Sequence, residues 1–518
     1  MSITNIAGIV RTHAASSPDG AALLYEGTTI TWRDLDERSS RVANGLAAEG
    51  VAEQGRIARI DKNGPDYFEL LMGAGKINAV LVDVNWRLAP PEMAQIVNDA
   101  QATVLFVGSE FVPQLEKFQA DLQTVKTIVV IGGGSATLPS YDDWLGSQSA
   151  EDPGVEPAPD DVCLQLYTSG TTGLPKGVML TNRNLFSFIE EVPRAWGFDQ
   201  TKTSIVVMPL FHIAGSGWGL VGMATGARTV LLREVDPVKI LAAVEQERVT
   251  HAIFVPAVLQ FLLITPTLAT TDVSSLELIA YGASPISEAV LRASIDAFKC
   301  KFVQVYGLTE TTGAAVQLDA EDHDPDNRPE LLRSCGKPYP WIEVKVVDPD
   351  GNEVAEGEVG ELWMRGVQIM KGYWNKPDET ARAITDDGWF KTGDAGYWRD
   401  GYLYLHDRVK DMIVSGGENV YPAEIENVLM AHPAVADVGV IGVPHDKWGE
   451  TVKAMVVKAD GADPTSEELI AYCRERLAGF KCPTSIDFID ALPRNPSGKI
   501  LKRELREPFW AGRERRIN

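Results

Sequence analysis

The chain has 518 residues, and its 48 Lys or Arg against 72 Asp or Glu give a formal net charge of −24. Nucleic acids are bound through basic surfaces, so this balance argues against a general DNA or RNA partner, and it disfavours an anionic membrane for the same reason. Hydrophobic residues make up 45% of the chain and charged residues 23%, which is typical of a globular protein. The length predicts at least two domains.

The five cysteines are widely spaced, and no CxxC pair occurs. Neither a disulfide framework nor a zinc site is therefore indicated. The N-terminus has no continuous apolar segment, and nowhere do eighteen apolar residues follow one another, so neither a signal peptide nor a transmembrane segment is predicted. We expect a soluble, cytoplasmic protein with reduced thiols.

Short runs rich in β-branched residues alternate with amphipathic segments in the first part of the chain. Strands are predicted at 103–108, 127–132, 203–209, 227–233, 250–256, 276–282 and 301–307. Helices are predicted between them at 237–247 and 287–298. This alternation is typical of parallel sheets covered by helices, in which ligands bind where the strands end.

The pattern changes from about residue 335, where a strand, an Asp-Gly turn and a second strand between 342 and 366 are typical of antiparallel structure. A polar stretch, Asp407-Arg-Val-Lys-Asp411, then precedes a separate pattern. That pattern consists of a helix from Pro422, strands near 437–443 and 452–458, and a helix at 465–478. We place a domain boundary at 408–410, with one domain at 1–408 and the other at 409–518.

The segment Tyr167-Thr-Ser-Gly-Thr-Thr-Gly-Leu-Pro-Lys-Gly-Val178 carries the strongest local signal. Its glycines let backbone amides approach an anion, its hydroxyl groups can donate hydrogen bonds, and Lys176 adds a positive charge. These are the features of a phosphate-binding loop. It is not a Walker A loop, because Gly177 follows Lys176 where Ser or Thr is needed. No GxSxG or HExxH pattern supports a serine hydrolase or zinc protease.

This loop resembles the signature loop of the adenylate-forming superfamily, which includes acyl-CoA synthetases, luciferases and peptide-synthetase adenylation domains. Further motifs of the family occur in the same order, over roughly residues 25 to 505: Met208-Pro-Leu-Phe-His212, Tyr306-Gly-Leu-Thr-Glu310, Thr392-Gly-Asp394, Asp407-Arg-Val-Lys-Asp411, Ser415-Gly-Gly-Glu-Asn-Val-Tyr-Pro-Ala-Glu-Ile425 and Asn495-Pro-Ser-Gly-Lys499. The resemblance implies an α/β fold. A large N-terminal domain of helix-covered sheets with a small barrel-like β subdomain is hinged, near Lys410, to a small α+β C-terminal domain.

Enzymes of this family join a carboxylate to the α-phosphate of ATP, which releases pyrophosphate, and a thiol then displaces AMP. The resemblance therefore implies ATP and CoA as co-substrates and Mg²⁺ as cofactor. It assigns catalytic roles to Lys499, Thr309, Glu310 and Lys176, with Glu310 holding the metal. The transferring phosphoryl group needs such positioned cations and donors.

The resemblance also assigns an ATP site. Tyr306 would lie against the adenine, Asp394 would bind the ribose hydroxyls, and Arg408 would assist at the ribose or phosphate. The implied ATP-binding residues are Thr168, Ser169, Gly170, Thr171, Thr172, Gly173, Lys176, Gly282, Ala283, Ser284, Tyr306, Gly307, Leu308, Thr309, Asp394, Arg408 and Lys499.

Two further sets of residues are implied for the acid and the thiol. The substrate pocket would be lined by His212, Trp218, Gly282, Gly307 and Gly313. CoA would contact Ser415, Gly416, Gly417, Trp448, Phe480 and Lys481. Cys482 and Thr484 depart from the family pattern, because many relatives carry basic residues there near the CoA phosphates.

The predicted function is an ATP-dependent acid:CoA ligase for a hydrophobic carboxylate, with a medium- or long-chain fatty acid favoured. Alternatives are an aryl or phenylpropenoic acid as substrate, and a free-standing adenylation enzyme that loads a carrier protein. No carrier-protein domain follows Lys499, so we do not expect a multidomain peptide synthetase. A nucleotide-binding regulator without catalysis is disfavoured, because every implied catalytic residue is present. Whether the enzyme forms a homodimer is left open.

Overall fold

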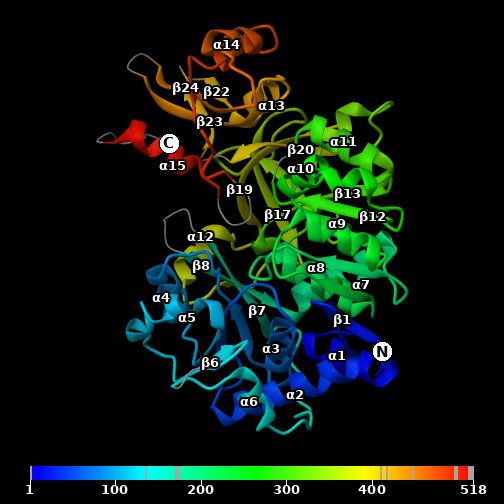
Figure 1. The fold of residues 1–518 in the computed structure, drawn as a ribbon. Helices are drawn as coiled ribbons and strands as arrows, with labels where there is room; N and C mark the ends of the chain where they lie inside the picture. Colours follow the sequence, from blue (N-terminus) through cyan, green and yellow to red (C-terminus); the bar gives the residue numbers. More distant parts are fainter. Residues whose placement is uncertain are drawn as a thin grey trace.

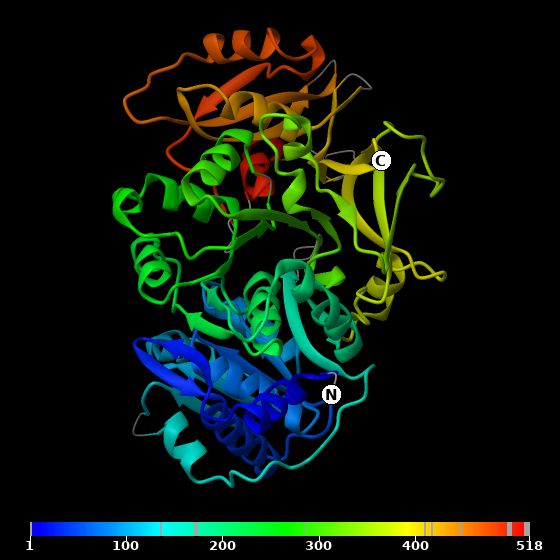
Figure 2. The same cartoon turned by 90° about the vertical axis from the view of Figure 1, so that its right-hand side faces the viewer.

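The computed structural model describes residues 3–134, 137–169, 175–284, 286–408, 411–415, 418–445, 448–494 and 500–511. Four sheets and their covering helices form an α/β structure (Figure 1). Figure 2 shows the sheet of residues 413–488 at one end of the molecule and the N-terminal helices at the other.

The first large sheet contains seven strands. Their order is β18 (Gly372–Tyr373), β8 (Pro175–Thr181), β7 (Val162–Ser169), β4 (Val80–Asp83), β3 (Arg56–Ile60), β5 (Val104–Gly108) and β6 (Thr127–Ile131). From β7 to β6 the strands are parallel, whereas β8 and β18 run antiparallel to their neighbours. The helices of this part of the chain are α1 (Ile6–Ser16), α2 (Trp32–Ala48), α3 (Pro65–Lys76), α4 (Pro90–Asp99), α5 (Val112–Leu115) and α6 (Tyr141–Gly146).

The second large sheet contains nine strands. Their order is β15 (Lys337–Pro338), β14 (Val316–Leu318), β13 (Lys301–Tyr306), β12 (Leu278–Gly282), β11 (His251–Phe254), β9 (Thr203–Val206), β10 (Arg228–Leu231), β1 (Ala21–Tyr25) and β2 (Thr28–Thr31). Its helices are α7 (Asn182–Trp196), α8 (Ile213–Ala224), α9 (Pro237–Gln246), α10 (Pro256–Ile264) and α11 (Glu288–Phe298). The seven strands and two helices predicted between residues 103 and 307 are confirmed in these two sheets and their helices.

The two remaining sheets are smaller and largely antiparallel. One has the order β16 (Ile342–Val347), β17 (Gly360–Gly366), β19 (Phe390–Arg399) and β20 (Tyr402–Arg408), with α12 (Pro377–Ala383) beside it. Leu403 of β20 also pairs with Gly336 in an isolated antiparallel bridge, so this sheet is joined to the segment before β15.

The other small sheet has the order β22 (Glu418–Val420), β21 (Ile413–Ser415), β24 (Gly449–Lys458) and β23 (Val435–His445), and β25 (Ser485–Phe488) pairs with β24. It is accompanied by α13 (Pro422–Met430), α14 (Ser466–Arg474) and α15 (Lys502–Trp510). The helices and strands predicted after Pro422 are therefore present. No helix in the described ranges is both long and apolar enough to cross a membrane.

Local sequence signals fix where several helices begin or end. Thr31 and Asp34 form a capping box at the start of α2, since each side chain bonds the backbone N–H of the other. Asp236 caps α9, whose first residue, Pro237, needs no backbone donor. Gly197 ends α7 with a φ of 73°, a left-handed conformation that suits glycine.

The two large sheets share one buried core. Phe68 of α3 and Trp218 of α8 both belong to it. A Cβ added at Gly219 of α8 would lie 2.9 Å from the ring of Phe68, so this glycine allows the helices of the two sheets to approach closely. Packing of α3 against α8 therefore fixes the relative position of the sheets.

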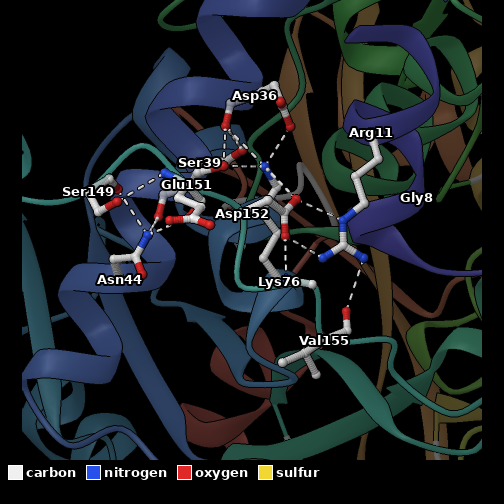
Figure 3. Close-up of polar contacts among 12 residues, drawn as sticks. Gly8, Arg11, Asp36, Ser39, Asn44, Lys76, Ser149, Glu151, Asp152 and Val155 are labelled. Carbon is white, nitrogen blue, oxygen red and sulfur yellow. Dashed lines mark hydrogen bonds and ion pairs between the residues drawn. The ribbon is translucent and has the colours of Figure 1, made fainter. Parts of the chain in front are cut away.

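A buried ion-pair network joins the N-terminal helices to the segment before β7 (Figure 3). Nζ of Lys76, whose side chain is fully buried, lies 2.6 Å from Oδ1 of Asp36 and 3.3 Å from Oδ2 of Asp152. Arg11 of α1 pairs with the same Asp152 at 2.7 Å. Because burial of an unpaired charge is costly, these pairs hold α1, α2 and α3 to the segment that leads into β7.

Candidate active site

The carboxyl ends of β12 and β13 form one wall of the candidate site. Gly282 ends β12 and is paired with Val305, the residue before Tyr306. A Cβ at Gly282 would lie 2.1 Å from the carbonyl oxygen of Val305, and Ala283 follows with a φ of 65°. The backbone is thus folded tightly at the end of β12, and the turn Gly282-Ala283-Ser284 lies beside Tyr306.

Tyr306 is linked to Asp394 of β19. Its hydroxyl donates a 2.8 Å hydrogen bond to Oδ2 of Asp394. Burial and the nearby negative charge raise the pKa of Tyr306 well above its usual value, so the phenol stays protonated and remains a donor. The backbone of Asp394 pairs with that of Arg408 in β20, which brings the two predicted nucleotide residues together at backbone level.

The turn after β13 holds Thr309 and Glu310 in buried positions. A Cβ at Gly307 would lie 2.4 Å from the carbonyl oxygen of Gly313, so the turn closes on itself only with glycine there. The backbone N–H of Leu308 donates to Oγ1 of Thr311 at 2.9 Å. The turn therefore presents Thr309 and Glu310 from a rigid backbone.

Glu310 is held by the β18 segment. The hydroxyl of Tyr373 donates to Oε1 of Glu310 at 2.9 Å, and the backbone N–H of Met370 donates to the carbonyl oxygen of Glu310 at 2.8 Å. Burial, followed by the charge of Glu310, raises the pKa of Tyr373. The carboxylate is thus oriented by a protonated phenol.

Lys176 lies on β8, opposite Thr168 of β7 in the strand register. Its Nζ forms an ion pair with Glu379 of α12 at 2.5 Å and lies 5.0 Å from the ring centroid of Tyr373. Before the loop, the hydroxyl of Tyr167 donates to Asp99 at 2.7 Å. The strands on both sides of the predicted phosphate loop are therefore anchored.

Part of the predicted site lies outside the described residues. This applies to Gly170, Thr171, Thr172, Gly173, Lys410, Gly416, Gly417 and Lys499. For three further predicted residues only the backbone is described, namely Ser169, Arg408 and Phe480.

His212 caps the N-terminus of α8. Its Nδ1 accepts the backbone N–H of Ala214 at 3.1 Å, and burial lowers the pKa of the imidazole to about 4. The ring is therefore neutral at pH 7, with its proton on Nε2. A Cβ at Gly313 would lie 3.0 Å from Ile213, so the turn after β13 contacts the start of α8 and brings Gly313 close to His212.

Trp218, predicted to line the pocket, lies in the core. Its side chain is almost fully buried, and its indole N–H donates to the carbonyl oxygen of Ile205 at 3.1 Å. Its ring centroid lies 5.6 Å from that of Trp196 and 5.3 Å from that of Phe198. In the structure this residue packs one face of α8 against its neighbours.

The predicted CoA residues are distributed over the C-terminal sheet. Ser415 of β21 pairs with Gly449, next to Trp448, whose side chain is 46% exposed. Lys481 forms an ion pair with Glu424 of α13 at 2.8 Å. Ser415 and Trp448 thus come from neighbouring strand ends, while Lys481 already has an acidic partner.

Two buried side chains that support the site were not predicted from the sequence. Asn63 donates to the carbonyl oxygen of Met208 at 3.1 Å and accepts from the N–H of Leu210 at 3.0 Å, which fixes the segment that leads to His212. Gln368 donates to the carbonyl oxygen of Ala314 at 3.0 Å, behind the Thr309–Glu310 turn. Each is a single polar residue, and no sequence pattern marks it.

A cavity of about 920 Å³ lies at the opposite edge of the nine-stranded sheet. Its lining includes Leu278 and Lys301, the first residues of β12 and β13, together with Trp196 and His323. It contains none of the predicted site residues, which gather at the other ends of these strands. Ligands of such sheets bind at the carboxyl ends of the strands, where the predicted residues lie.

Comparison with known proteins agrees with this arrangement. The AMP-binding enzyme family matches residues 10–374, and the AMP-binding enzyme C-terminal domain matches residues 424–499. The chain is 42% identical to the fatty acid–[acyl-carrier-protein] ligase ScoC of Streptomyces coeruleorubidus, over 98% of this chain and 96% of that protein. It is 40% identical to a feruloyl-CoA synthase of an Amycolatopsis species, over 96% and 97%.

A solved structure shows the same fold over the whole chain. The anthranilate CoA ligase AuaEII, crystallised with anthranoyl-AMP, aligns with a TM-score of 0.90 and 26% identity, and the alignment covers 98% of each chain. This chain therefore belongs to the AMP-binding enzyme family of the adenylate-forming superfamily, as its motifs had indicated.

Proposed function

We propose that the chain is an ATP-dependent acid–CoA ligase for a hydrophobic carboxylate, with a medium- or long-chain fatty acid as the favoured substrate. The enzyme would form an acyl-adenylate and pyrophosphate, and CoA would then displace AMP. The observation that carries the proposal is the convergence of Tyr306, Asp394, Glu310 and Lys176 on one region of a chain that belongs to the adenylating family.

The nucleoside part of ATP would bind between the ends of β12 and β13. The turn Gly282-Ala283-Ser284 supplies one wall and Tyr306 the other, with Gly307 and Leu308 leading into the phosphate region. Asp394 can accept hydrogen bonds from both ribose hydroxyls, because a carboxylate has several acceptor positions. The hydrogen bond from Tyr306 orients that carboxylate.

The phosphates would bind where the Thr309–Glu310 turn faces Lys176. Thr309 offers a hydroxyl to the α-phosphate and Lys176 a cation to the β- and γ-phosphates. Mg²⁺ in nucleotide sites is usually held by one or two carboxylates plus substrate phosphates, and Glu310, oriented by Tyr373, fits this donor set. Bound there, Mg²⁺ would neutralise charge on the phosphate oxygens.

We further propose that the chain consists of an N-terminal domain at 1–408 and a C-terminal domain at 409–518, hinged at Lys410. Lys499 would contact the substrate carboxylate and the α-phosphate during adenylation. A rotation about Lys410 would then bring Ser415, Gly416 and Gly417 to the thiol passage. The five cysteines are free, which suits an enzyme of the cytoplasm, where we place it.

The acyl chain would bind beside the start of α8. Gly307 and Gly313 let the turn after β13 pack tightly against the start of α8, and the neutral His212 adds no charge to the pocket. Burying a charge beside an aliphatic or aromatic acid chain would be costly, so an uncharged histidine is compatible with a hydrophobic substrate.

A second candidate function is supported by the relatives. The similar protein ScoC is named as a ligase that uses an acyl-carrier protein, and the other relative acts on ferulate. The thiol acceptor of this chain could therefore be a carrier protein, and the acid could be a phenylpropenoic acid. Both alternatives keep the adenylation step and change one co-substrate.

The test is pyrophosphate release with ATP and Mg²⁺ over acids from acetate to long-chain fatty acids, benzoate and ferulate. Each acid is assayed alone, with CoA and with a holo-acyl-carrier protein, and the products are identified by mass spectrometry. An acyl-CoA product supports the proposal, and a product formed only on the carrier protein supports the second candidate. Failure to bind ATP would contradict both.

The Lys499→Ala variant tests the division between the two half-reactions. It should lose adenylate formation and keep thioester formation from supplied acyl-adenylate, because only the first step needs a cation between the carboxylate and the phosphate. Equal losses in both half-reactions would contradict this role.

A further inference from the structure

One segment, residues 370–380, contacts both the strand that carries Lys176 and the turn that carries Glu310. Its strand β18 pairs with β8, and the N–H of Trp374 donates to the carbonyl oxygen of Gly177 at 2.8 Å. On the other side, Met370 and Tyr373 donate to Glu310. We call residues 370–380 the bridge segment.

The bridge segment also supplies an acidic partner for Lys176. Oε2 of Glu379 contacts Nζ of Lys176, whose side chain is only 11% exposed. The other carboxylate oxygen of Glu379 accepts from Arg382 at 2.6 Å. The side chain of Glu379 is 22% exposed, so this ion pair is partly shielded from solvent and is stronger than a typical surface pair.

The backbone holds Glu379 in this position. The N–H of Tyr373 donates to Oγ1 of Thr380 at 2.9 Å, and Thr380 in turn donates to the carbonyl oxygen of Lys376 at 3.0 Å. A Cβ at Gly372 would lie 2.9 Å from Cγ2 of Thr380, so β18 and α12 are in close contact. Glu379 is therefore placed on Lys176 by a fixed strand–helix unit.

The ion pair conflicts with the proposed use of Lys176. Lys176 cannot neutralise the β- and γ-phosphates fully while its Nζ stays paired with the carboxylate of Glu379 at 2.5 Å. That carboxylate also repels the phosphates. We propose that Glu379 is an exchangeable counter-ion of Lys176. The triphosphate displaces Glu379 from Lys176 when ATP binds, and Glu379 pairs with Lys176 again when pyrophosphate leaves. This inference rests on the proposed function and adds a positioning residue to it.

The proposal assigns Glu379 a specific energetic effect. It competes only with ligands that carry the β- and γ-phosphates, so it weakens the binding of ATP and pyrophosphate and leaves AMP unaffected. Recapture of Lys176 would favour release of pyrophosphate after adenylation. A purely structural role for Glu379 would alter the binding of all three ligands or of none.

The first experiment compares Glu379→Gln with Asp378→Asn. Both variants remove one negative charge. Asp378 lies in the same helical turn as Glu379 and is exposed, and its carboxylate makes no contact with Lys176 in the described residues. Calorimetry would measure the dissociation constants of a non-hydrolysable ATP analogue, pyrophosphate and AMP. We expect Glu379→Gln to bind the first two about three- to tenfold more tightly, AMP equally, and Asp378→Asn to change each less than twofold.

The second experiment repeats Glu379→Gln in a Lys176→Met background. Without the lysine, removal of Glu379 should improve the binding of the ATP analogue much less, since competition for Lys176 is gone and only direct repulsion between Glu379 and the phosphates remains. Weaker binding by Glu379→Gln, equal effects of the two single variants, or an unchanged effect in the Lys176→Met background would each overturn the proposal.

The readout separates this inference from the proposed function. A wild-type protein that binds no ATP analogue would refute the proposed function itself. A wild-type protein that binds the analogue, with a Glu379→Gln variant of equal affinity, would refute only the role of Glu379. Thermal unfolding of each variant confirms that it is folded, and Glu379→Ala serves as a second substitution if Glu379→Gln is unstable.

Discussion

The hydroxyl of Tyr306 lies 2.8 Å from Oδ2 of Asp394, although 88 residues separate them in the chain. This bond joins the end of β13 to β19 at the proposed ribose site. We predict that Tyr306→Phe raises the KM for ATP about five- to thirtyfold with a smaller effect on kcat, because losing a hydrogen bond to a carboxylate costs about 1–2 kcal/mol. Titration of ATP in the pyrophosphate assay measures this.

The matched control for this prediction is Tyr339→Phe. Tyr339 is also buried, and its hydroxyl donates to Oε1 of Gln317 at 2.7 Å rather than to Asp394. This variant should lose stability and keep the wild-type KM for ATP. An equal rise in KM for both variants would show that loss of a buried phenol, and not orientation of Asp394, is responsible.

Gly307→Ala should disrupt the turn that presents Thr309 and Glu310. The new methyl group would lie 2.4 Å from the carbonyl oxygen of Gly313, and a displacement of about 1 Å at a catalytic group can cost about 10²-fold in rate. We expect adenylation to fall about a hundredfold. Gly146→Ala, where no atom lies within 4 Å of the added Cβ, is the control and should retain wild-type activity.

Lys76→Met should destabilise the N-terminal helices. The substitution removes the cation that Asp36 and Asp152 share, but these carboxylates are 32% and 28% exposed and Asp152 keeps its pair with Arg11, so we expect a loss of about 1–3 kcal/mol of unfolding free energy. Denaturant unfolding measures the loss. Lys202→Met removes a pair with Glu277 at the surface and should change stability little; a comparable loss there would argue against a special role for burial.

Protonation of His212 and His323 should destabilise the folded protein as the pH decreases from about 6.5 toward 4, against an opposite contribution from Asp83, whose pKa burial raises to about 7. Burial lowers the pKa of both His212 and His323 to about 4, from an ordinary value of 6.5. In that interval the unfolded chain binds protons that the folded chain does not, so protonation favours unfolding. Urea unfolding at pH 7 and pH 5 measures the change in stability, and His323→Gln should be relatively more stable at pH 5 than the wild type is. A pH dependence that His323→Gln leaves unchanged would contradict a neutral His323 in the folded protein.

Hydrophobic patterning predicted most of the fold because buried parallel strands are continuous apolar runs, such as Val104–Gly108. The end of the strand predicted at 203–209 was less well defined. Its observed end is Val206, and beyond it the carbonyl oxygen of Met208 accepts a hydrogen bond from the side chain of Asn63. The motifs likewise selected Tyr306, Glu310 and Asp394; in the structure Tyr306 bonds Asp394, and Glu310 lies in the turn that follows Tyr306.

The supporting contacts could not be predicted in the same way. The partners of Asn63, Gln368 and Glu379 lie 145, 54 and 203 positions away in the chain, and one polar residue carries no periodic signal. The sequence also could not show that Trp218 packs into the core, since a tryptophan after the glycine-rich run Gly215-Ser-Gly217 suits a pocket equally well. Such roles depend on distant neighbours rather than on local spacing.

The pairing of β18 with β8 has a consequence for synthesis of the chain. Residues 372–373 leave the ribosome roughly 190 residues after β8 ends, which corresponds to roughly 10–40 s at ordinary elongation rates. During that time one edge of β8, beside the predicted phosphate loop, has no partner strand in the nascent chain. An unpaired strand edge can pair with a strand of another chain, which leads to misassembly. Protein shortened before residue 373 should therefore aggregate, and early folding of this enzyme would benefit from chaperones that shield this edge.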